Sequence, residues 1–225
     1  WVAISSWMKK KALESKILEN KNIEIIYSGV DSNQFVILNK NQIREQLGFC
    51  QDDKIILIGA GNIRESFKGF EFAVEAMNRL NRSYKIITFG SQTFLPNEIP
   101  QKYIHYGVVN INKLVKLYNA ADLFLGPSIA EAMGKTFVEA QLCGLPAICF
   151  KNTGPEDIIQ HKKTGYIAKF KDVDDLIKGV DYCFNTHWNH EYIRKHTMEN
   201  FDISIIAKKY INIYEKSIKS FDFVQ

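Results

Sequence analysis

The chain has 225 residues, a hydrophobic content of 46% and a formal net charge of +4, so it can build a sizeable globular core. The charge is too small to indicate nucleic-acid binding, and no nucleic-acid-reading motif is present. It fits an anionic ligand or a contact with an anionic membrane surface. Four scattered cysteines without a CxxC pair argue against a zinc ribbon. They favour a cytoplasmic location. The positive charge also allows a location at the inner face of the membrane.

The first residues predict a helix over 1–20 and a short strand over 23–27. The chain opens on Trp1 rather than Met, so we expect this numbering to begin inside a longer protein. No apolar run approaches the roughly 18 residues that a membrane-spanning helix needs.

Apolar runs then alternate with helical patterns. Strands are predicted at 54–58, 85–89, 104–106, 122–125, 147–150 and 166–168. Helices are predicted at 42–47, around 70–80, from a cap at Asn112 to 121, and at 136–143, 156–160, 173–183, 189–200 and 202–220. Such alternation predicts an α/β fold, a Rossmann-like parallel sheet flanked by helices. Ligands of such sheets bind at the carboxyl ends of the strands.

Two glutamates, Glu131 and Glu139, follow the strand at 122–125. Carboxylates at a strand-to-helix turn are placed to bind hydroxyl groups, since each accepts two hydrogen bonds. The N–H groups of Gly134, Lys135 and Thr136 open the next helix, and helix N-termini bind anions. A ligand with hydroxyls and phosphates, such as a nucleotide sugar, is therefore expected. Taken alone, either glutamate is more often a solvated acid near a helix end.

With its flanking residues, this stretch resembles the retaining GT-B glycosyltransferases of family four. The residues that carry the resemblance are Pro127, Ser128, Glu131, Gly134, Glu139, Ala140, Cys143, Gly144 and Pro146. Ala132 and Met133 depart from the glycine and aromatic residue usual there. The resemblance implies the C-terminal, donor-binding domain of a GT-B fold. It also implies that Glu131 holds the donor sugar, that Glu139 holds the ribose, and that Met133 to Thr136 contact the donor.

A second group of residues runs from Gly59 to Gly69. It starts as Gly-x-Gly after a strand, but Arg64 stands where a dinucleotide site needs a third glycine. A pair of cations that stabilises a departing diphosphate fits better. The family places an arginine where Asn62 stands here, so Arg64 is the expected replacement beside Lys68.

The predicted site follows from these two stretches. Its expected catalytic residues are Lys68, Arg64 and Glu131. Its expected donor-binding residues are Gly61, Asn62, Met133, Gly134, Lys135, Thr136 and Glu139, with Gly107 and Val108 beside the base. No metal and no cofactor are expected, since His187 and His190 lack a third ligand.

The resemblance implies transfer of a hexosyl unit from a nucleoside-diphosphate sugar to a carbohydrate or lipid-linked acceptor, with retention, in bacterial capsule or lipopolysaccharide synthesis. It implies three parts. Residues 1–35 end a missing N-terminal domain and form the junction, 36–188 bind the donor, and 189–225 are C-terminal helices.

Two alternatives stay open. One is a non-catalytic nucleotide-binding module that partners another chain, with Trp1 and Trp7 on the docking face. The other is a nucleotide-sugar epimerase or a phosphorylase of the same architecture, because fold does not decide function.

Overall fold

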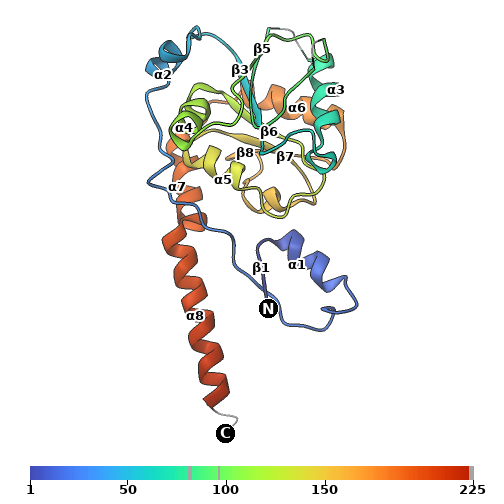
Figure 1. Ribbon diagram of the computed structural model, residues 1–225, viewed down its shortest axis with the longest axis vertical. Helices are drawn as coiled ribbons and strands as arrows, with labels where there is room; N and C mark the ends of the chain where they lie inside the picture. Colours follow the sequence, from blue (N-terminus) through green and yellow to red (C-terminus); the bar gives the residue numbers. More distant parts are fainter. Residues whose placement is uncertain (81–82, 96, 223–225) are drawn as a thin grey trace.

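The computed structural model describes residues 1–80, 83–95 and 97–222. A six-stranded, fully parallel sheet forms its centre, in the order β5-β4-β3-β6-β7-β8 (Figure 1). The strands are β3 (Ile55–Gly59), β4 (Lys85–Phe89), β5 (Tyr103–His105), β6 (Leu123–Gly126), β7 (Ala147–Phe150) and β8 (Gly165–Ala168). The predicted alternation of strands and helices is confirmed.

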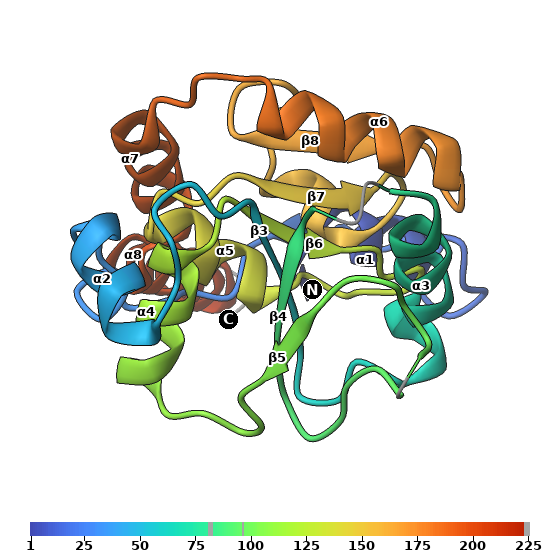
Figure 2. The same cartoon turned by 90° about the horizontal axis from the view of Figure 1, so that it is seen from above.

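Helices cover both faces of this sheet. They are α2 (Lys40–Leu47), α3 (Phe70–Arg79), α4 (Ile111–Ala120), α5 (Lys135–Leu142), α6 (Val173–Phe184) and α7 (His190–Phe201). Side chains alternate along β3, so Ile55 and Leu57 pack with residues of α4 and α5, whereas Ile56 and Ile58 pack with residues of α3 and α6. Figure 2 shows these two helical layers on either side of the sheet. Burial of both faces explains the near-continuous apolar strands.

The strand order reverses between β3 and β6. The chain moves from β3 outward to β4 and β5, and then returns to β6 and moves outward the other way to β7 and β8. The carboxyl ends of β3 and β6 therefore open a crevice at the reversal point, where parallel sheets of this kind bind ligands.

The N-terminal segment differs from the prediction. Instead of one helix over 1–20, it forms β1 (Val2–Ala3) and the short helix α1 (Ser6–Leu13). The Ser5 hydroxyl accepts a hydrogen bond of 3.0 Å from the Met8 N–H, which fixes the start of α1. β1 pairs with β2 (Glu24–Ile25) in a two-stranded sheet separate from the central one.

Two other predicted boundaries are wrong for local reasons. Asn110, and not Asn112, caps α4, because its side chain accepts from the N–H of Lys113 at 2.9 Å. A cap side chain bonds the N–H two or three positions further on. The helix expected at 156–160 is a 3-10 turn, η2 (Gly154–Asp157), with Pro155 in its first turn. A second 3-10 turn, η1 (Ser66–Lys68), precedes α3.

The last helix, α8 (Ile203–Asp222), extends away from the body of the molecule (Figure 1). Ile206 is buried near its start, whereas Ile211, Tyr214 and Ile218 are exposed. Within the residues described, no helix is both long enough and apolar enough to cross a bilayer.

Candidate active site

The loops that leave β3 and β6 touch through their backbones. The N–H of Ile129 donates to the carbonyl of Phe67 at 2.9 Å. Gly69 has a φ of +66°, and a Cβ there would lie 1.8 Å from the carbonyl oxygen of Pro127. Only glycine fits both the backbone angle and this contact. The two loops that carry the predicted site are therefore held together at the reversal point of the sheet.

Lys68 and Glu131 meet at this contact. The ammonium of Lys68 lies 2.6 Å from a carboxylate oxygen of Glu131, and both side chains are about four-fifths buried, with exposures of 20% and 19%. The carbonyl of Glu131 accepts from the N–H of Gly154 at 2.8 Å, which anchors its loop to the segment after β7. The structure thus brings together two residues that the sequence places in one site.

Arg64 has other partners. Its guanidinium donates to the carboxylate of Glu98 at 2.9 Å and to the carbonyl of Thr93 at 3.2 Å. It also lies 4.6 Å from the centre of the Phe70 ring. Burial works against ionisation of Glu98, but the hydrogen bonds from Arg64 and the Leu95 N–H hold its pKa below the ordinary value. In this conformation Arg64 is paired with the loop after β4 and not with Glu131.

The Gly61–Asn62 turn leaves room for a ligand. A Cβ at Gly61 would meet no atom within 4 Å, so its backbone is open to close approach. The Asn62 side chain accepts from the N–H of Arg64 at 3.0 Å and so shapes the loop. The Gly61 carbonyl accepts from the N–H of Ser91 at 2.8 Å, which links this loop to the one after β4.

Helix α5 begins beside Glu131. Gly134 caps it with a φ of +85°, and Lys135 and Thr136 form its first turn, where N–H groups lack partners inside the helix. The side chain of Met133, expected to contact the donor, is not on the surface. Its side chain is 3% exposed, and its sulfur accepts from the N–H of Ser28 at 3.0 Å. The side chain of Met133 therefore belongs to the core, and only its backbone is left for a ligand.

Glu139 follows on α5. One of its carboxylate oxygens accepts from the hydroxyl of Tyr118 at 3.0 Å. Burial is the main cause that raises the pKa of Glu139 above its ordinary value, and it outweighs the Tyr118 hydrogen bond, which lowers that pKa. The sequence places Tyr118 on the apolar face of α4, and its side chain is fully buried. Sequence reasoning missed Tyr118, whose only signal is a hydroxyl on a core-facing position.

The loop after β5 completes the edge of the crevice. Gly107 has a φ of +66°, and its carbonyl accepts from the N–H of Gly90 at 2.9 Å. Val108, the next residue, is 82% exposed. A Cβ at Gly107 would meet no atom within 4 Å, so the backbone here is open to close approach.

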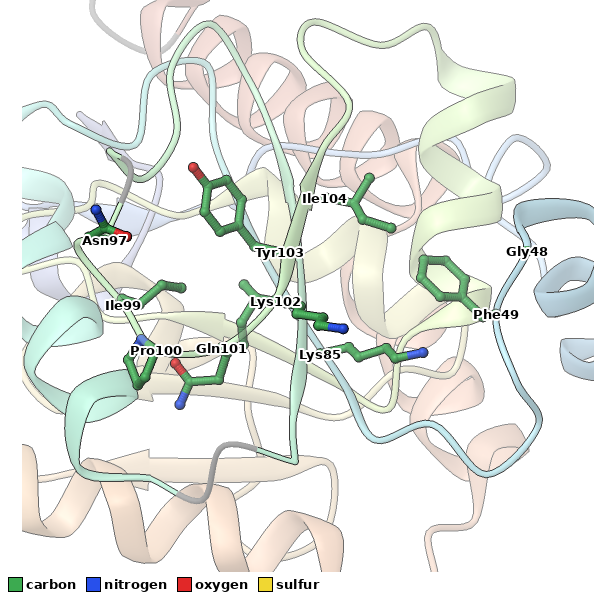
Figure 3. A pocket seen from close by; sticks show the side chains of 11 residues that line it. Gly48, Phe49, Lys85, Asn97, Ile99, Pro100, Gln101, Lys102, Tyr103 and Ile104 are labelled. Carbon is green, nitrogen blue, oxygen red and sulfur yellow. The ribbon is translucent and has the colours of Figure 1, made fainter.

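Two cavities differ in their relation to this site. A cavity of about 20 Å³ lies at the ends of β3 and β6, with Gly59, Lys68, Gly126 and Ser128 among its lining residues. A larger cavity of about 610 Å³ lies at the beginning of β4 and β5 (Figure 3). Its lining residues Lys85 and Lys102 point toward Phe49 in that view. None of the predicted site residues lines the larger cavity.

Metal-binding side chains do not gather in the part of the chain that the structure describes, where no group of three or more His, Cys, Asp or Glu residues could hold an ion. Of the two histidines noted in the sequence, His190 has its Nδ1 atom 2.8 Å from the carbonyl oxygen of Gly144. This contact ties the start of α7 to the end of α5.

Comparison with known proteins identifies the family to which the chain belongs. The family described as "Glycosyl transferases group 1" matches residues 39–198. The chain belongs to this glycosyltransferase family. An uncharacterised glycosyltransferase of Methanocaldococcus jannaschii is 27% identical over 95% of this chain and 59% of its own length. The capsular polysaccharide biosynthesis glycosyltransferase CapM of Staphylococcus aureus is 22% identical over 97% of this chain and 62% of its own. The chain therefore spans about three fifths of these relatives.

Solved glycosyltransferase structures share the fold. A glycosyltransferase from Rickettsia africae superposes with a TM-score of 0.82 at 24% identity, over 97% of this chain and 63% of that one. Anabaena HepE, solved in complex with UDP-glucose, has a TM-score of 0.79 at 18% identity, over 96% of this chain and 63% of its own. These similarities confirm the predicted fold class, a Rossmann-like parallel sheet of the GT-B type.

Proposed function

We propose that this chain is the nucleotide-sugar-binding half of a retaining glycosyltransferase, which moves a hexosyl unit from a nucleoside-diphosphate sugar to a carbohydrate or lipid-linked acceptor. One observation carries the proposal. The contact between Lys68 and Glu131 places an ammonium and a carboxylate at the reversal point of the sheet, beside the N-terminus of α5. A ligand with adjacent hydroxyls and phosphates matches this combination of groups.

Different protein groups bind the sugar and the diphosphate of the donor. The Glu131 carboxylate accepts from hydroxyls of the donor sugar, and the N–H groups of Lys135 and Thr136 face the diphosphate. Lys68 stabilises the charge that develops on the departing β-phosphate. Arg64 is the proposed second cation, and it must leave Glu98 to reach the phosphate. Gly61 and Asn62 approach the diphosphate through the backbone.

The nucleoside lies farther along the edge. One oxygen of Glu139 is bonded to Tyr118, which leaves the other oxygen to accept from a ribose hydroxyl. Gly107 and Val108 flank the base. The proposed reaction needs no metal and no cofactor, because Lys68 and the helix N-terminus supply the positive potential that a divalent ion would otherwise supply.

The division of the chain is part of the same proposal. Residues 1–35 end an N-terminal domain that holds the acceptor, and their β1–β2 pair, separate from the central sheet, supports this division. Residues 36–188 bind the donor, and 189–225 form the C-terminal helices. The proposed role is capsule or lipopolysaccharide synthesis at the cytoplasmic face of the membrane, and the name of the relative CapM of Staphylococcus aureus, a capsular polysaccharide biosynthesis glycosyltransferase, supports the capsule part.

Titration calorimetry with UDP, GDP and their sugar derivatives tests the proposal. We expect at least one nucleotide to bind the folded chain, weakly, because full affinity needs closure of two domains. We also expect Glu139→Ala to weaken that binding. A folded chain that binds no nucleotide would contradict the proposal.

The alternative, a non-catalytic nucleotide-binding module that partners another chain, rests on exposed apolar side chains near the N-terminus. Trp1 is 71% exposed and Ile17 is 83% exposed. This alternative predicts a stable complex with a separate chain and no sugar transfer by that complex. Sedimentation of the complex, combined with a transfer assay, separates the two functions.

A further inference from the structure

A third cavity adjoins the Glu131 loop. It has a volume of about 520 Å³ and lies between α1 and the segment after β7, with Trp7, Lys10, Lys11, Asn152, Glu156 and Phe170 among its lining residues. It is large enough for one or two sugar rings and falls in the usual size range of small-molecule sites. The donor site described above uses none of these six side chains.

The walls of this cavity are fixed to each other and to the donor site. The N–H of Ser6 donates to the carboxylate of Asp157 at 2.6 Å, which fastens α1 to η2. The N–H of Gly154 donates to the carbonyl of Glu131. Ile129, two positions before Glu131, also lines the cavity. A molecule in the cavity would therefore lie next to the loop that holds the donor sugar.

The lining suits a sugar ring. Trp7 is half-buried, and its indole N–H has no hydrogen-bond partner in the described chain. Phe170 is 42% exposed. Aromatic rings bury the C–H faces of sugars, while an indole N–H and nearby amides bind their hydroxyls. Asn152 adds such an amide.

The charges in the cavity favour an anion. Lys11 is paired with Glu14 at 2.8 Å, and the Glu156 carboxylate accepts from the N–H of Asn152 at 2.7 Å. Lys10 forms no ion pair with any residue that the structure describes, and its side chain is exposed at the cavity. Because Glu14 already pairs with Lys11, the Lys10 ammonium is the cation at this cavity that is left to bind an anion.

We propose that this cavity binds the acceptor, and that the acceptor carries an anionic group, a phosphate or a carboxylate, on or next to a sugar ring. The assignment rests on the proposed function, because it needs a donor sugar over Glu131. Trp7 stacks on the acceptor ring and Lys10 pairs with the anion. The acceptor ring then lies next to the loop that holds the donor sugar.

Nuclear magnetic resonance of the 225-residue chain tests the proposal through the indole N–H of Trp7, assigned with Trp7→Phe. The probes are glucose 1-phosphate, glucuronic acid, glucose and inorganic phosphate. We expect the anionic sugars to shift the Trp7 signal in a saturable way. The affinity taken from this shift should be at least fivefold higher for one of the anionic sugars than for glucose. The tighter of the two anionic sugars identifies the anion. Equal affinity for glucose, or for inorganic phosphate alone, would overturn the proposal.

Matched lysine variants test the role of the charge. Lys10→Ala should weaken anionic-sugar binding at least fivefold, whereas Lys178→Ala, on the exposed side of α6, should leave it unchanged. Equal effects of both variants would show a general effect of charge and overturn the assignment. Nucleotide titrations of the same samples separate the two proposals. If nucleotides bind but the anionic sugars do not shift the Trp7 signal, the acceptor site alone is overturned. If the anionic sugars shift the Trp7 signal but no nucleotide binds, the proposed function is overturned, and the acceptor role with it.

Discussion

The ammonium of Lys68 lies 2.6 Å from the carboxylate of Glu131, although 63 positions separate them in the sequence. Both side chains are about four-fifths buried, so the cost of desolvating the two charges offsets much of their attraction, and the pair contributes little net stability. Its larger effect is to hold two reactive groups at fixed positions before the donor arrives.

Lys68→Ala should therefore lower turnover of the complete enzyme by more than tenfold, equivalent to about 1.4 kcal/mol of transition-state stabilisation. The reason is that the β-phosphate loses its nearest cation. The variant also leaves the largely buried Glu131 carboxylate without its partner, so the melting temperature should fall. Steady-state kinetics and a melting curve on the same preparation give both values.

Lys85→Ala is the matched control for Lys68→Ala. Lys85 forms an ion pair of the same length, 2.6 Å, with Asp53, and it lies at the beginning of β4, away from the site. This variant should keep full turnover. Equal turnover of both variants would remove Lys68 from the reaction.

Glu139→Gln tests the cost of the buried carboxyl. Burial raises the pKa of Glu139, so the folded chain holds this proton more tightly than the unfolded chain. Stability contributed by this group is therefore lost as pH rises from the ordinary glutamate pKa through the raised one. The glutamine variant should be more stable at neutral pH and lose this part of the pH dependence. Chemical denaturation at several pH values measures both effects.

Nucleotide affinity should show the opposite pH dependence at the same residue. The ribose hydroxyls need the ionised carboxylate, so affinity should fall as pH drops through the raised pKa of Glu139. In Glu139→Gln, affinity should be lower and this pH dependence should disappear. Calorimetry across the same pH series gives the answer, and a wild-type affinity that rises on acidification would contradict the ribose role.

Gly69→Ala should disrupt the contact between the two site loops. The new methyl would meet the Pro127 carbonyl at 1.8 Å, and the residue would also keep an unfavourable positive φ. The positive φ costs about 1–2 kcal/mol, and the clash adds about 1–3 kcal/mol. Gly48→Ala is the control, because Gly48 has a φ of +75° but no atom within 4 Å of the added Cβ. It should show the conformational cost alone and keep nucleotide affinity, as denaturation and calorimetry would reveal.

Removal of divalent ions should leave donor affinity within a few fold, because the proposed site balances the diphosphate with Lys68 and the N-terminus of α5. Calorimetry with and without a chelator measures this change. Complete loss of donor binding would contradict the metal-free proposal.

Much of the sheet could be predicted because its strands are buried on both faces. The bounds of β4 and β7 match the predicted 85–89 and 147–150. A short, largely apolar run is most stable as a strand in the middle layer of the fold, where both of its faces are buried. Side-chain partners are harder to predict. Arg64 pairs with Glu98, 34 positions away in another loop, and no local pattern encodes that contact. Met133 is drawn into the core by its packing beside Ser28, 105 positions away.

Calorimetry of Glu131→Ala and Glu139→Ala with UDP-sugar or GDP-sugar, and with the matching bare nucleotide, tests the central claim most directly. We predict that Glu131→Ala weakens binding of the nucleotide sugar but leaves the bare nucleotide unaffected, whereas Glu139→Ala weakens both. If Glu131→Ala left nucleotide-sugar affinity unchanged, or lowered both affinities equally, the donor sugar would not lie over Glu131.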